Sequence, residues 1–399
     1  MARPPEVGMV VVQPTGFCNI DCAYCYLPNR NDKHVMAQST VKRLFGELFA
    51  SGWAAPRVTV IWHAGEPLVV PPSFYREAFA AIEAMRPKSV QIVHSFQTNG
   101  MLIDAAWCAL FRDWHVGVGV SIDGPRELHD ANRKMRNGAG TFDRTLAGIR
   151  TLRAERVPFH VISVLSRRSL GMADELLDFY IAEGIDHVCF NVEESEGSHI
   201  SELMVDAERQ VRYAAFLRRF WQQARADGRV RFVREIDNAI ERIFRPDEIQ
   251  TRNIQVEPLA MLNVDSRGNV SSFSPELLGL ANADYDDYLL GNIDRDSLQT
   301  IHDNCLKSAL LRDIRAGVEA CSASCEYFSV CGGGAPVNKL FENGSFATTR
   351  TSFCSLTQMV PTDLILEAYD RLEQGGVDDP VTAAMATALN GTLPASRTP

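Results

Sequence analysis

Hydrophobic runs of strand length recur along the first half of the chain, separated by segments of helical periodicity. Each run is nearly continuous in apolar residues, as expected for parallel strands that are covered on one or both faces. Alternation of strands and helices at this spacing predicts βαβ units and a parallel sheet. The runs are GMVVVQ, RVTVIWH, SVQIVHSFQT, HVGVGVSID, FHVISVL and DHVCFNV.

The helical segments between these runs are clearest in STVKRLFGELFASG, which we expect to begin at Ser39, a residue type that caps helices. Six such units fit either an open doubly wound sheet or an incomplete barrel, and periodicity does not choose between them. The pattern changes after Glu196. Residues 205–247 predict two long helices, and a strand–turn–strand with Gly268 in its turn follows them.

The last quarter of the chain has a different character. From residue 321 it is expected to be rich in loops and carries several cysteines, and residues 358–373 have helical periodicity.

An arginine-rich stretch from Arg209 to Arg234 is interpreted as a solvated helix face, with contact to an acidic peptide as the alternative.

Composition narrows the class of protein. The chain has 399 residues, of which 46% are hydrophobic, and no apolar run of about 18 residues. Its start, MARPPEVGMVVV, lacks the layout of a signal peptide, so we expect a cytoplasmic protein without a membrane partner. The net charge of −10 argues against a nucleic-acid partner.

Ten cysteines in a reducing compartment indicate metal ligands or buried thiols rather than disulfides. Three of them, Cys18, Cys22 and Cys25, form a C-x3-C-x2-C pattern directly after the first predicted strand. Structural zinc normally has four protein ligands, and an iron–sulfur cube is normally held by four thiolates. Three thiolates on a cube leave one iron open, and we favour this interpretation, with the missing ligand supplied by a substrate or cofactor.

The motif GFCNIDCAYCY, with Tyr24 before the last cysteine and Tyr26 after it, resembles that of the radical S-adenosylmethionine (SAM) enzymes. The resemblance implies a partial (β/α)6 barrel and a [4Fe–4S] cluster whose open iron binds the amino and carboxylate groups of SAM. The reduced cluster of that family cleaves SAM to a 5′-deoxyadenosyl radical. The barrel is therefore the expected α/β architecture.

Motifs at the ends of the next three predicted strands are similar to the SAM-binding segments of the same family. They are WHAGEPL, in which Ala64 replaces the first glycine of a GGEP motif, SFQTNG, and SIDGPRELHDANR. Each of these motifs, taken alone, could instead have a structural role as a turn, a helix cap or a surface ion pair. The carboxyl ends of successive strands are where α/β barrels place their chemistry. The SAM-binding residues implied are Tyr24, Gly65, Glu66, Gln97, Ser121 and Arg133.

A second group of cysteines lies near the C-terminus: Cys321, Cys325, Cys331 and Cys354. By number alone these four thiols suit zinc or an iron–sulfur cube equally well. Beside a radical SAM core the region resembles the SPASM extension, which usually carries two auxiliary [4Fe–4S] clusters. The ligands of one of these clusters are missing, because residues 256–273 contain no cysteine and Ala335 replaces another, so we expect one auxiliary cluster. The remaining cysteines, Cys108, Cys189 and Cys305, are interpreted as buried thiols.

These resemblances imply an organisation in four parts. We expect the radical SAM partial barrel at residues 1–200 and a helical bridge at 201–255. A SPASM-like auxiliary-cluster domain is expected at 256–372 and a mobile tail at 373–399.

Sulfatase-maturating enzymes share this architecture and oxidise Cys or Ser to formylglycine. They carry a catalytic aspartate directly after a hairpin cysteine, where this chain has Phe273 and Ser274. The chain more closely resembles the GrrM/OscB group of cyclophane-forming maturases, which act on glycine-rich precursor peptides. The segments that carry this resemblance include VVVQPTGFCNIDCAYCYLPNRNDK, FNVEESEG, FSPELLG and CEYFSVCGGGAPVNKLFENGSFATT.

The cyclophane resemblance implies that the deoxyadenosyl radical removes a hydrogen atom from the β-carbon of a precursor residue. The carbon radical then attacks the ring of an aromatic residue two positions earlier, and loss of a proton and an electron closes a three-residue ring. A proton acceptor is required, and Asp123, Glu193 and Glu194 are candidates because they end strands that face the expected cavity. The auxiliary cluster either accepts the electron or braces its domain.

Partners follow from the same resemblance: a precursor peptide and an electron donor such as flavodoxin or ferredoxin. Two alternatives remain open at this stage. One is another radical SAM peptide modification, such as formylglycine formation, thioether formation or epimerisation. The other is a metal-binding scaffold without enzymatic activity.

Overall fold

The computed structural model describes residues 4–196, 199–244, 253–374, 382 and 385 of the chain. Within these residues ten strands form one continuous sheet in the order β10-β9-β8-β1-β2-β3-β4-β5-β6-β7. The strands from β1 to β6 pair in parallel with their neighbours in the chain. Their bounds are β1 Val7–Val12, β2 Ala54–Trp62, β3 Gln91–Thr98, β4 Gly117–Ser121, β5 His160–Leu165 and β6 His187–Val192.

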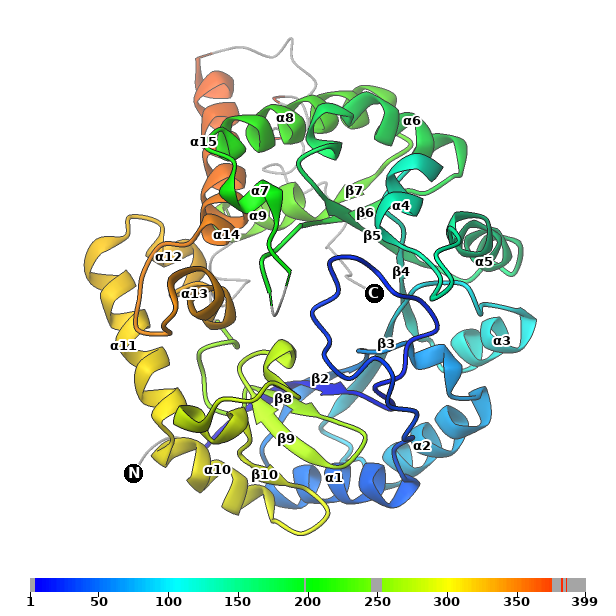
Figure 1. Cartoon of the computed structure of the whole chain (residues 1–399), viewed down its shortest axis with the longest axis vertical. Coiled ribbons are helices and arrows are strands. Elements are labelled where there is room, and N and C mark those ends of the chain that lie inside the picture. Colours follow the sequence, from blue (N-terminus) through cyan, green and yellow to red (C-terminus); the bar gives the residue numbers. More distant parts are fainter. Residues whose placement is uncertain (1–3, 197–198, 245–252, 375–381, 383–384, 386–399) are drawn as a thin grey trace.

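Helices cover the outer face of this curved sheet, as Figure 1 shows. The α/β fold expected from the sequence, a partial (β/α)6 barrel with a C-terminal extension, is therefore confirmed. The covering helices are α1 Gln38–Ser51, α2 Pro72–Met85, α3 Ala105–Asp113, α4 Arg126–Asn132, α5 Phe142–Ala154 and α6 Ala173–Ala182.

The expected start of α1 at Ser39 was wrong. The N-cap is Ala37, which provides no side-chain cap, and Ser39 lies inside the helix. The helix ends at Gly52, whose φ of 70° is the left-handed conformation that favours glycine as a helix terminator.

The two faces of the barrel strands differ in burial. In β2, Val58, Val60 and Trp62 are buried, whereas the alternating Thr59 and Ile61 are partly exposed. Successive residues of a strand point to opposite faces, so the buried set faces the helices and the other set faces the barrel interior. The outer face is apolar and the inner face remains accessible to a ligand.

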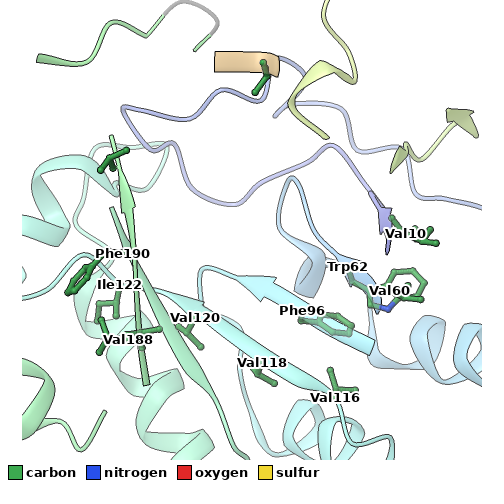
Figure 2. Packing of buried hydrophobic residues seen from close by; sticks show 14 of the residues in the cluster. Val10, Val60, Trp62, Phe96, Val116, Val118, Val120, Ile122, Val188 and Phe190 are labelled. Carbon is green, nitrogen blue, oxygen red and sulfur yellow. The ribbon is translucent and has the colours of Figure 1, made fainter. Parts of the chain in front are cut away.

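Aromatic side chains fill the layer between strands and helices. Trp62 makes an edge contact with Tyr75 of α2, with their ring centroids 5.2 Å apart, and Tyr75 makes a similar contact with Phe96 at 4.8 Å. Figure 2 shows Trp62 and Phe96 close to the valines of neighbouring strands. Aromatic rings of this size contribute a large part of the buried apolar area of a core, so this layer fixes how the strand ends are arranged.

Beyond β6 the chain forms α7 Glu202–Val205, α8 Arg209–Asp227, β7 Phe232–Val233 and α9 Arg234–Phe244. The expected hairpin follows as β8 Met261–Val264 and β9 Asn269–Ser272, with Gly268 in the turn at φ 77°. Strand β8 pairs in parallel with β1, and β10, Gly291–Asn292, pairs with β9. The hairpin therefore continues the barrel sheet.

The expectation of a loop-rich segment from residue 321 was wrong, because much of it is helical. Glycines at residues 332–334 and 344 adopt positive φ and divide the segment into short helices, which obscures any helical period in the sequence. These short helices are α12 Phe328–Cys331, α13 Pro336–Asn343 and α14 Ser352–Cys354. Before them lie α10 Leu298–Lys307 and α11 Ala309–Ser324, and after them α15 Val360–Glu373.

Most of the expected tail at 373–399 lies outside the described residues. Cys108, Cys189 and Cys305 are buried free thiols, as predicted. Among the described residues, no helix combines the length and the apolar character needed to cross a lipid bilayer.

Candidate active site

The cysteine motif lies in the loop between β1 and α1, which is dark blue in Figure 1 and crosses the middle of the ring of strands. Cys18, Cys22 and Cys25 are all partly buried free thiols. The backbone N–H of Cys25 donates to the carbonyl of Cys22 over 3.2 Å, and that of Cys18 donates to the carbonyl of Arg30 over 3.1 Å. The first bond forms a turn between Cys22 and Cys25, and the second ties Cys18 to the segment after the motif.

Gly65 allows the second motif to lie against this loop. Its φ is 63°, and a Cβ atom there would lie 2.6 Å from the carbonyl oxygen of Thr15 and 2.7 Å from that of Phe17. Only glycine fits both the conformation and the space. Ala64 also has a positive φ, 65°, which an L-residue adopts at a cost of about 1 kcal/mol. The close approach places Glu66 next to the cysteine loop.

Glu66 is almost fully buried, with 1% of its surface exposed. Its carboxylate accepts hydrogen bonds from the Thr98 hydroxyl over 2.6 Å, from the Asn99 backbone over 2.8 Å and from the Leu68 backbone over 3.0 Å. Burial raises the pKa of Glu66 to about 7. A carboxylate has about four acceptor positions, so one remains for a further donor such as an amino group.

Asp123, Arg133 and Tyr24 form a second group beside the cysteines. Arg133 Nε donates to Asp123 Oδ1 over 3.1 Å, and the Tyr24 hydroxyl donates to Asp123 Oδ2 over 2.5 Å. The guanidinium of Arg133 also lies 5.4 Å from the centre of the Tyr24 ring, and its Nη1 lies 3.9 Å from Cys22 Sγ. Arg133 is 6% exposed, so a buried guanidinium, paired with Asp123, lies at the cysteine motif.

Asp123, one of the expected proton acceptors, has contacts that indicate a different role. Besides the bonds from Arg133 and Tyr24, its Oδ1 accepts the backbone N–H of Val164 over 3.0 Å. The carboxylate therefore joins the ends of β4 and β5 and orients Arg133. These contacts are those of a positioning residue.

Gln97 and Ser121 lie on neighbouring strands, and the Gln97 amide donates to the Ser121 hydroxyl over 2.9 Å. Gly119 makes room for this pair, since a Cβ there would lie 2.3 Å from Gln97 Oε1 and 2.7 Å from His160 Nε2. The small residue on β4 thus leaves space for polar side chains on the inner face of the barrel. Both expected SAM-binding residues lie among them.

Burial raises the pKa of the Cys18 thiol to about 12 and that of Cys22 to about 11. Such thiols ionise when they bind a metal, because metal coordination displaces the proton. The Arg133 guanidinium near Cys22, and the Asn99 amide 4.0 Å from Cys18 Sγ, are suited to stabilising thiolates. These surroundings fit an anionic iron–sulfur cluster.

Glu193 and Glu194 follow β6 but have different partners. Glu193 contacts His199 Nε2 over 3.1 Å and Ser201 Oγ over 3.3 Å, so it holds the loop after β6. Glu194 instead accepts a hydrogen bond from the Asn338 amide of α13 over 2.5 Å. This contact links the barrel to the C-terminal helices.

Two carboxyl groups that the sequence did not single out lie near Glu194, besides Glu342, which accepts hydrogen bonds from the backbone N–H groups of Ser352 and Phe353. Glu196 and Glu276 interact electrostatically with Glu194, and Glu196 also interacts with Cys25. Burial raises the pKa of all three carboxyl groups, and their mutual repulsion raises the pKa of Glu194 and Glu196 further. The available signal was their place in FNVEESEG and FSPELLG, two strings that stand apart in the sequence. We call Glu194, Glu196 and Glu276 the acidic trio.

The four C-terminal cysteines line a single cavity of about 460 Å³. This space is more than ten times the roughly 30 Å³ that one water molecule takes up in the liquid, so it admits a group of several atoms. Among the described residues, no three or more His, Cys, Asp or Glu side chains are arranged to hold one metal ion. Four thiols around a space of this size fit a [4Fe–4S] cluster.

Comparisons with known proteins place the chain in a family. Residues 12–180 match the Radical SAM superfamily. The chain is also 37% identical over 367 residues to the uncharacterized protein sll1766 of Synechocystis sp., and this match covers 91% of the chain and 92% of that protein. The chain belongs to the radical SAM superfamily.

This radical SAM protein is also 31% identical over 246 residues to a serine-type anaerobic sulfatase-maturating enzyme of Klebsiella aerogenes. That match covers 61% of the chain and 60% of the enzyme. The solved structure of native anSMEcpe with bound AdoMet and Cp18Cys peptide matches with a TM-score of 0.72 at 20% identity, covering 94% of this chain and 99% of that one. At this identity the likeness shows the fold alone.

Membership of the radical SAM superfamily implies a [4Fe–4S] cluster and SAM. The residues around the cysteine motif fit both groups, because they combine three thiols, a buried cation and a carboxylate with one acceptor position free. Electron transfer from such a cluster to bound SAM supplies the radical chemistry of the family.

Proposed function

We propose that this radical SAM protein is a peptide maturase that forms C–C crosslinks in a ribosomally made, glycine-rich precursor. Each crosslink joins an aromatic ring carbon to the β-carbon of a nearby residue and closes a three-residue cyclophane. The resemblance of FNVEESEG and FSPELLG to the GrrM/OscB maturases supports this function. The peptide substrates of the similar sulfatase-maturating enzymes support the peptide part of the proposal.

The observation that carries the proposal is the end of the β8–β9 hairpin. Sulfatase-maturating enzymes have a cysteine and a catalytic aspartate there, whereas this chain has Phe273 and Ser274, both 0% exposed. Phe273 belongs to the hydrophobic core, and the Ser274 hydroxyl donates to the Glu276 carboxylate. The hairpin end is therefore closed by an apolar side chain, and the acid bonded to its serine is Glu276.

The overall change in the peptide balances as follows. One hydrogen atom leaves the β-carbon, a C–C bond forms to the ring, and the ring then loses one proton and one electron. The peptide loses two hydrogens per crosslink and gains no atoms. The protein must therefore hold the two carbons together and provide acceptors for the proton and the electron.

We assign the binding of SAM to the residues around the cysteine motif. Gly65 and Glu66 would take its amino group, and Ser121 and Arg133 its carboxylate. Gln97 positions Ser121 through its hydrogen bond, while Tyr24 and Asp123 hold Arg133. In this assignment Asp123 orients a binding residue and leaves the proton transfer to another group.

The acidic trio is the proposed proton acceptor. Glu193 is hydrogen-bonded to His199 and Ser201 and holds the loop after β6, and Asp123 holds Arg133 in an ion pair, so we assign both carboxyl groups structural roles. Glu196 is 8% exposed and accepts no hydrogen bond to its carboxyl group from the described residues. Three carboxyl groups together share protons readily, because ionising one raises the pKa of the others. A raised pKa makes each of these groups a stronger base when it is ionised, so a carboxylate of the trio that is ionised would take the ring proton and pass it to a neighbour.

We call the cavity lined by the four C-terminal cysteines the auxiliary cavity. It is the proposed site of one [4Fe–4S] cluster, held by Cys321, Cys325, Cys331 and Cys354. We propose that this cluster accepts the electron that the ring releases. A one-electron carrier protein such as flavodoxin or ferredoxin would serve as the partner that reduces the SAM-binding cluster. Glu194 joins the two regions through Asn338, which is the residue before Lys339 on α13.

Formylglycine formation is the second candidate function, and the 31% identity to the Klebsiella aerogenes enzyme favours it. Oxidation of a serine to formylglycine also removes two hydrogens from a peptide. The mass change alone therefore does not separate the two functions, but the chemistry of the product does. Formylglycine is an aldehyde and reacts with hydrazides, whereas a cyclophane does not.

The test is co-expression of the protein with a glycine-rich peptide that carries spaced aromatic residues, taken from a short reading frame beside the gene if one is found there, followed by mass spectrometry of the peptide. Crosslinking predicts a loss of two hydrogens per ring, resistance of the bridged residues to fragmentation, and no reaction with a hydrazide probe. An unchanged peptide, or a modified peptide that reacts with the hydrazide, would contradict it. The matched control is Cys22→Ala, which removes one ligand of the proposed SAM-binding cluster and should leave the peptide unchanged.

A further inference from the structure

Lys339 is a buried cation in the wall of the auxiliary cavity. It is 3% exposed, and its Nζ donates to the carbonyl of Gly317 over 2.9 Å and contacts Cys321 Sγ over 3.3 Å. Within the described residues no Asp or Glu pairs with it. A buried ammonium group without an anion is strongly unfavourable, so this position calls for a negative charge in the cavity.

The cluster proposed for this cavity supplies that charge. Four thiolates and a [4Fe–4S] core together carry a formal charge of about −2 when oxidised and about −3 when reduced. The contact between Nζ and Cys321 Sγ places the ammonium group directly on one of these thiolates. The cation and its anionic partner would thus meet inside the protein, where water screens their interaction least.

We propose that Lys339 raises the reduction potential of the auxiliary cluster, so that this cluster accepts the electron released when the peptide ring closes. A nearby positive charge stabilises the more negative, reduced cluster, and a hydrogen bond to a ligating sulfur acts in the same direction. The cluster takes up the one electron that the peptide ring releases and then passes it to the oxidised form of a one-electron carrier protein. This inference rests on the proposed auxiliary cluster and deepens the proposed function.

Other charged residues line the same cavity but are less suited to this role. Glu326 and Arg350 are both exposed, so water screens their charges, and Arg350 Nε donates to the Ser355 hydroxyl. Arg242 interacts electrostatically with Cys331 but is absent from the cavity lining. Lys339 alone among these cations combines deep burial with contact to a cysteine sulfur, so its charge should have the largest effect.

The test measures the midpoint potential of the auxiliary cluster by EPR-monitored redox titration of the full-length protein. Cys18, Cys22 and Cys25 are replaced by alanine so that only the auxiliary cluster is titrated. Lys339→Met, which removes both the charge and the donor, is expected to lower the midpoint potential. Lys339→Arg, which keeps the charge, should shift it less. Arg350→Met, which removes an exposed cation of the same cavity, is the matched control and should shift it least.

Lys339→Gln guards against a folding defect in Lys339→Met, because it keeps a donor for Gly317 and Cys321 and removes only the charge. It should lower the potential by an intermediate amount at unchanged iron content. If the potentials of Lys339→Gln and Lys339→Met equal that of the parent protein, the inference is overturned while the auxiliary cluster and the crosslinking proposal stand. If the four cysteines assemble no iron–sulfur cluster, both the cluster and the inference are wrong.

Discussion

At the scale of single residues, the sequence motifs singled out several residues that lie near the first cysteine motif, but not the charged residue that is buried near the second. The structure brings Glu66 and Arg133 beside the first cysteine motif, and Tyr24 of the motif shares Asp123 with Arg133. Glu276 and Lys339 were missed, because nothing in the local sequence marks their burial or their partners. From the sequence alone, a charged side chain on a helix is expected to be exposed to solvent, and only the fold shows that it is buried.

Glu66 makes SAM binding dependent on pH. Its pKa of about 7 in the SAM-free protein lies above the ordinary value of 4.5, so the group is protonated as pH falls through 7. A protonated carboxyl group is a poorer acceptor for the amino group of SAM. If bound SAM holds Glu66 ionised, affinity should fall about tenfold from pH 8 to pH 6.

Isothermal titration of SAM into the reconstituted protein at constant ionic strength measures this dependence. Glu66→Gln is the control, since the amide still accepts from Thr98 or Leu68 but does not titrate. Any pH dependence that remains in Glu66→Gln comes from SAM or from other groups. Equal slopes in the two proteins would show that Glu66 plays no part.

The acidic trio should act after SAM cleavage. Glu196→Gln or Glu276→Gln removes one proton acceptor, so crosslinking should slow by about a hundredfold while 5′-deoxyadenosine still forms. Separate quantification of 5′-deoxyadenosine and crosslinked peptide checks this uncoupling. Glu193→Gln, which alters a carboxyl group bonded to His199 and Ser201, is the matched control and should crosslink normally. Retained crosslinking in both trio variants would remove the trio from the mechanism.

At the scale of elements, regular strands were predictable and the helices that carry cysteines were not. The strands from β1 to β6 are long apolar runs whose identity does not depend on context. Helices α12 and α14 are only a turn long, and each ends at a cysteine of the second group. Such short helices depend on tertiary contacts more than on local propensity, so no periodic signal marks them.

Gly317 of α11 supports this arrangement of short elements. A Cβ there would lie 2.1 Å from the Phe346 carbonyl and 3.2 Å from Lys339 Nζ, so Gly317→Ala should push the neighbouring segment away and distort the cavity. Loss of about 3 kcal/mol of stability and a fall from about eight to about four irons per chain are expected. Chemical denaturation and iron analysis after anaerobic reconstitution measure both.

Gly344→Ala is the matched control for Gly317→Ala. Gly344 has a φ of 75°, but apart from its chain neighbours no atom lies within 4 Å of the position that a Cβ would take, so alanine there adds backbone strain without a clash. It should cost about 1 kcal/mol and keep the full iron content. Equal iron contents in the two variants would mean that α11 does not shape the cluster site.

At the scale of the whole molecule, many contacts join the barrel to the C-terminal extension, and two of them bear on the proposed site. The hairpin β8–β9 extends the barrel sheet through the pairing of β8 with β1. The loop after β6 meets α13 through Glu194 and Asn338. The sequence indicated each part but not these joints, because pairing between distant strands and contacts between distant side chains leave no local pattern. The second joint brings the acidic trio into contact with the helix that carries Lys339.

The central claim is that an aromatic ring of the peptide is a reaction partner. The most direct test uses a precursor whose aromatic residues carry deuterium at every ring carbon that bears hydrogen, incubated with the reconstituted protein, SAM and a reductant. Crosslinking predicts that each ring closure removes one ring deuterium and one β-hydrogen, as seen by tandem mass spectrometry. A modified peptide that keeps all its ring deuterium, as formylglycine formation, thioether formation or epimerisation would give, would contradict the account.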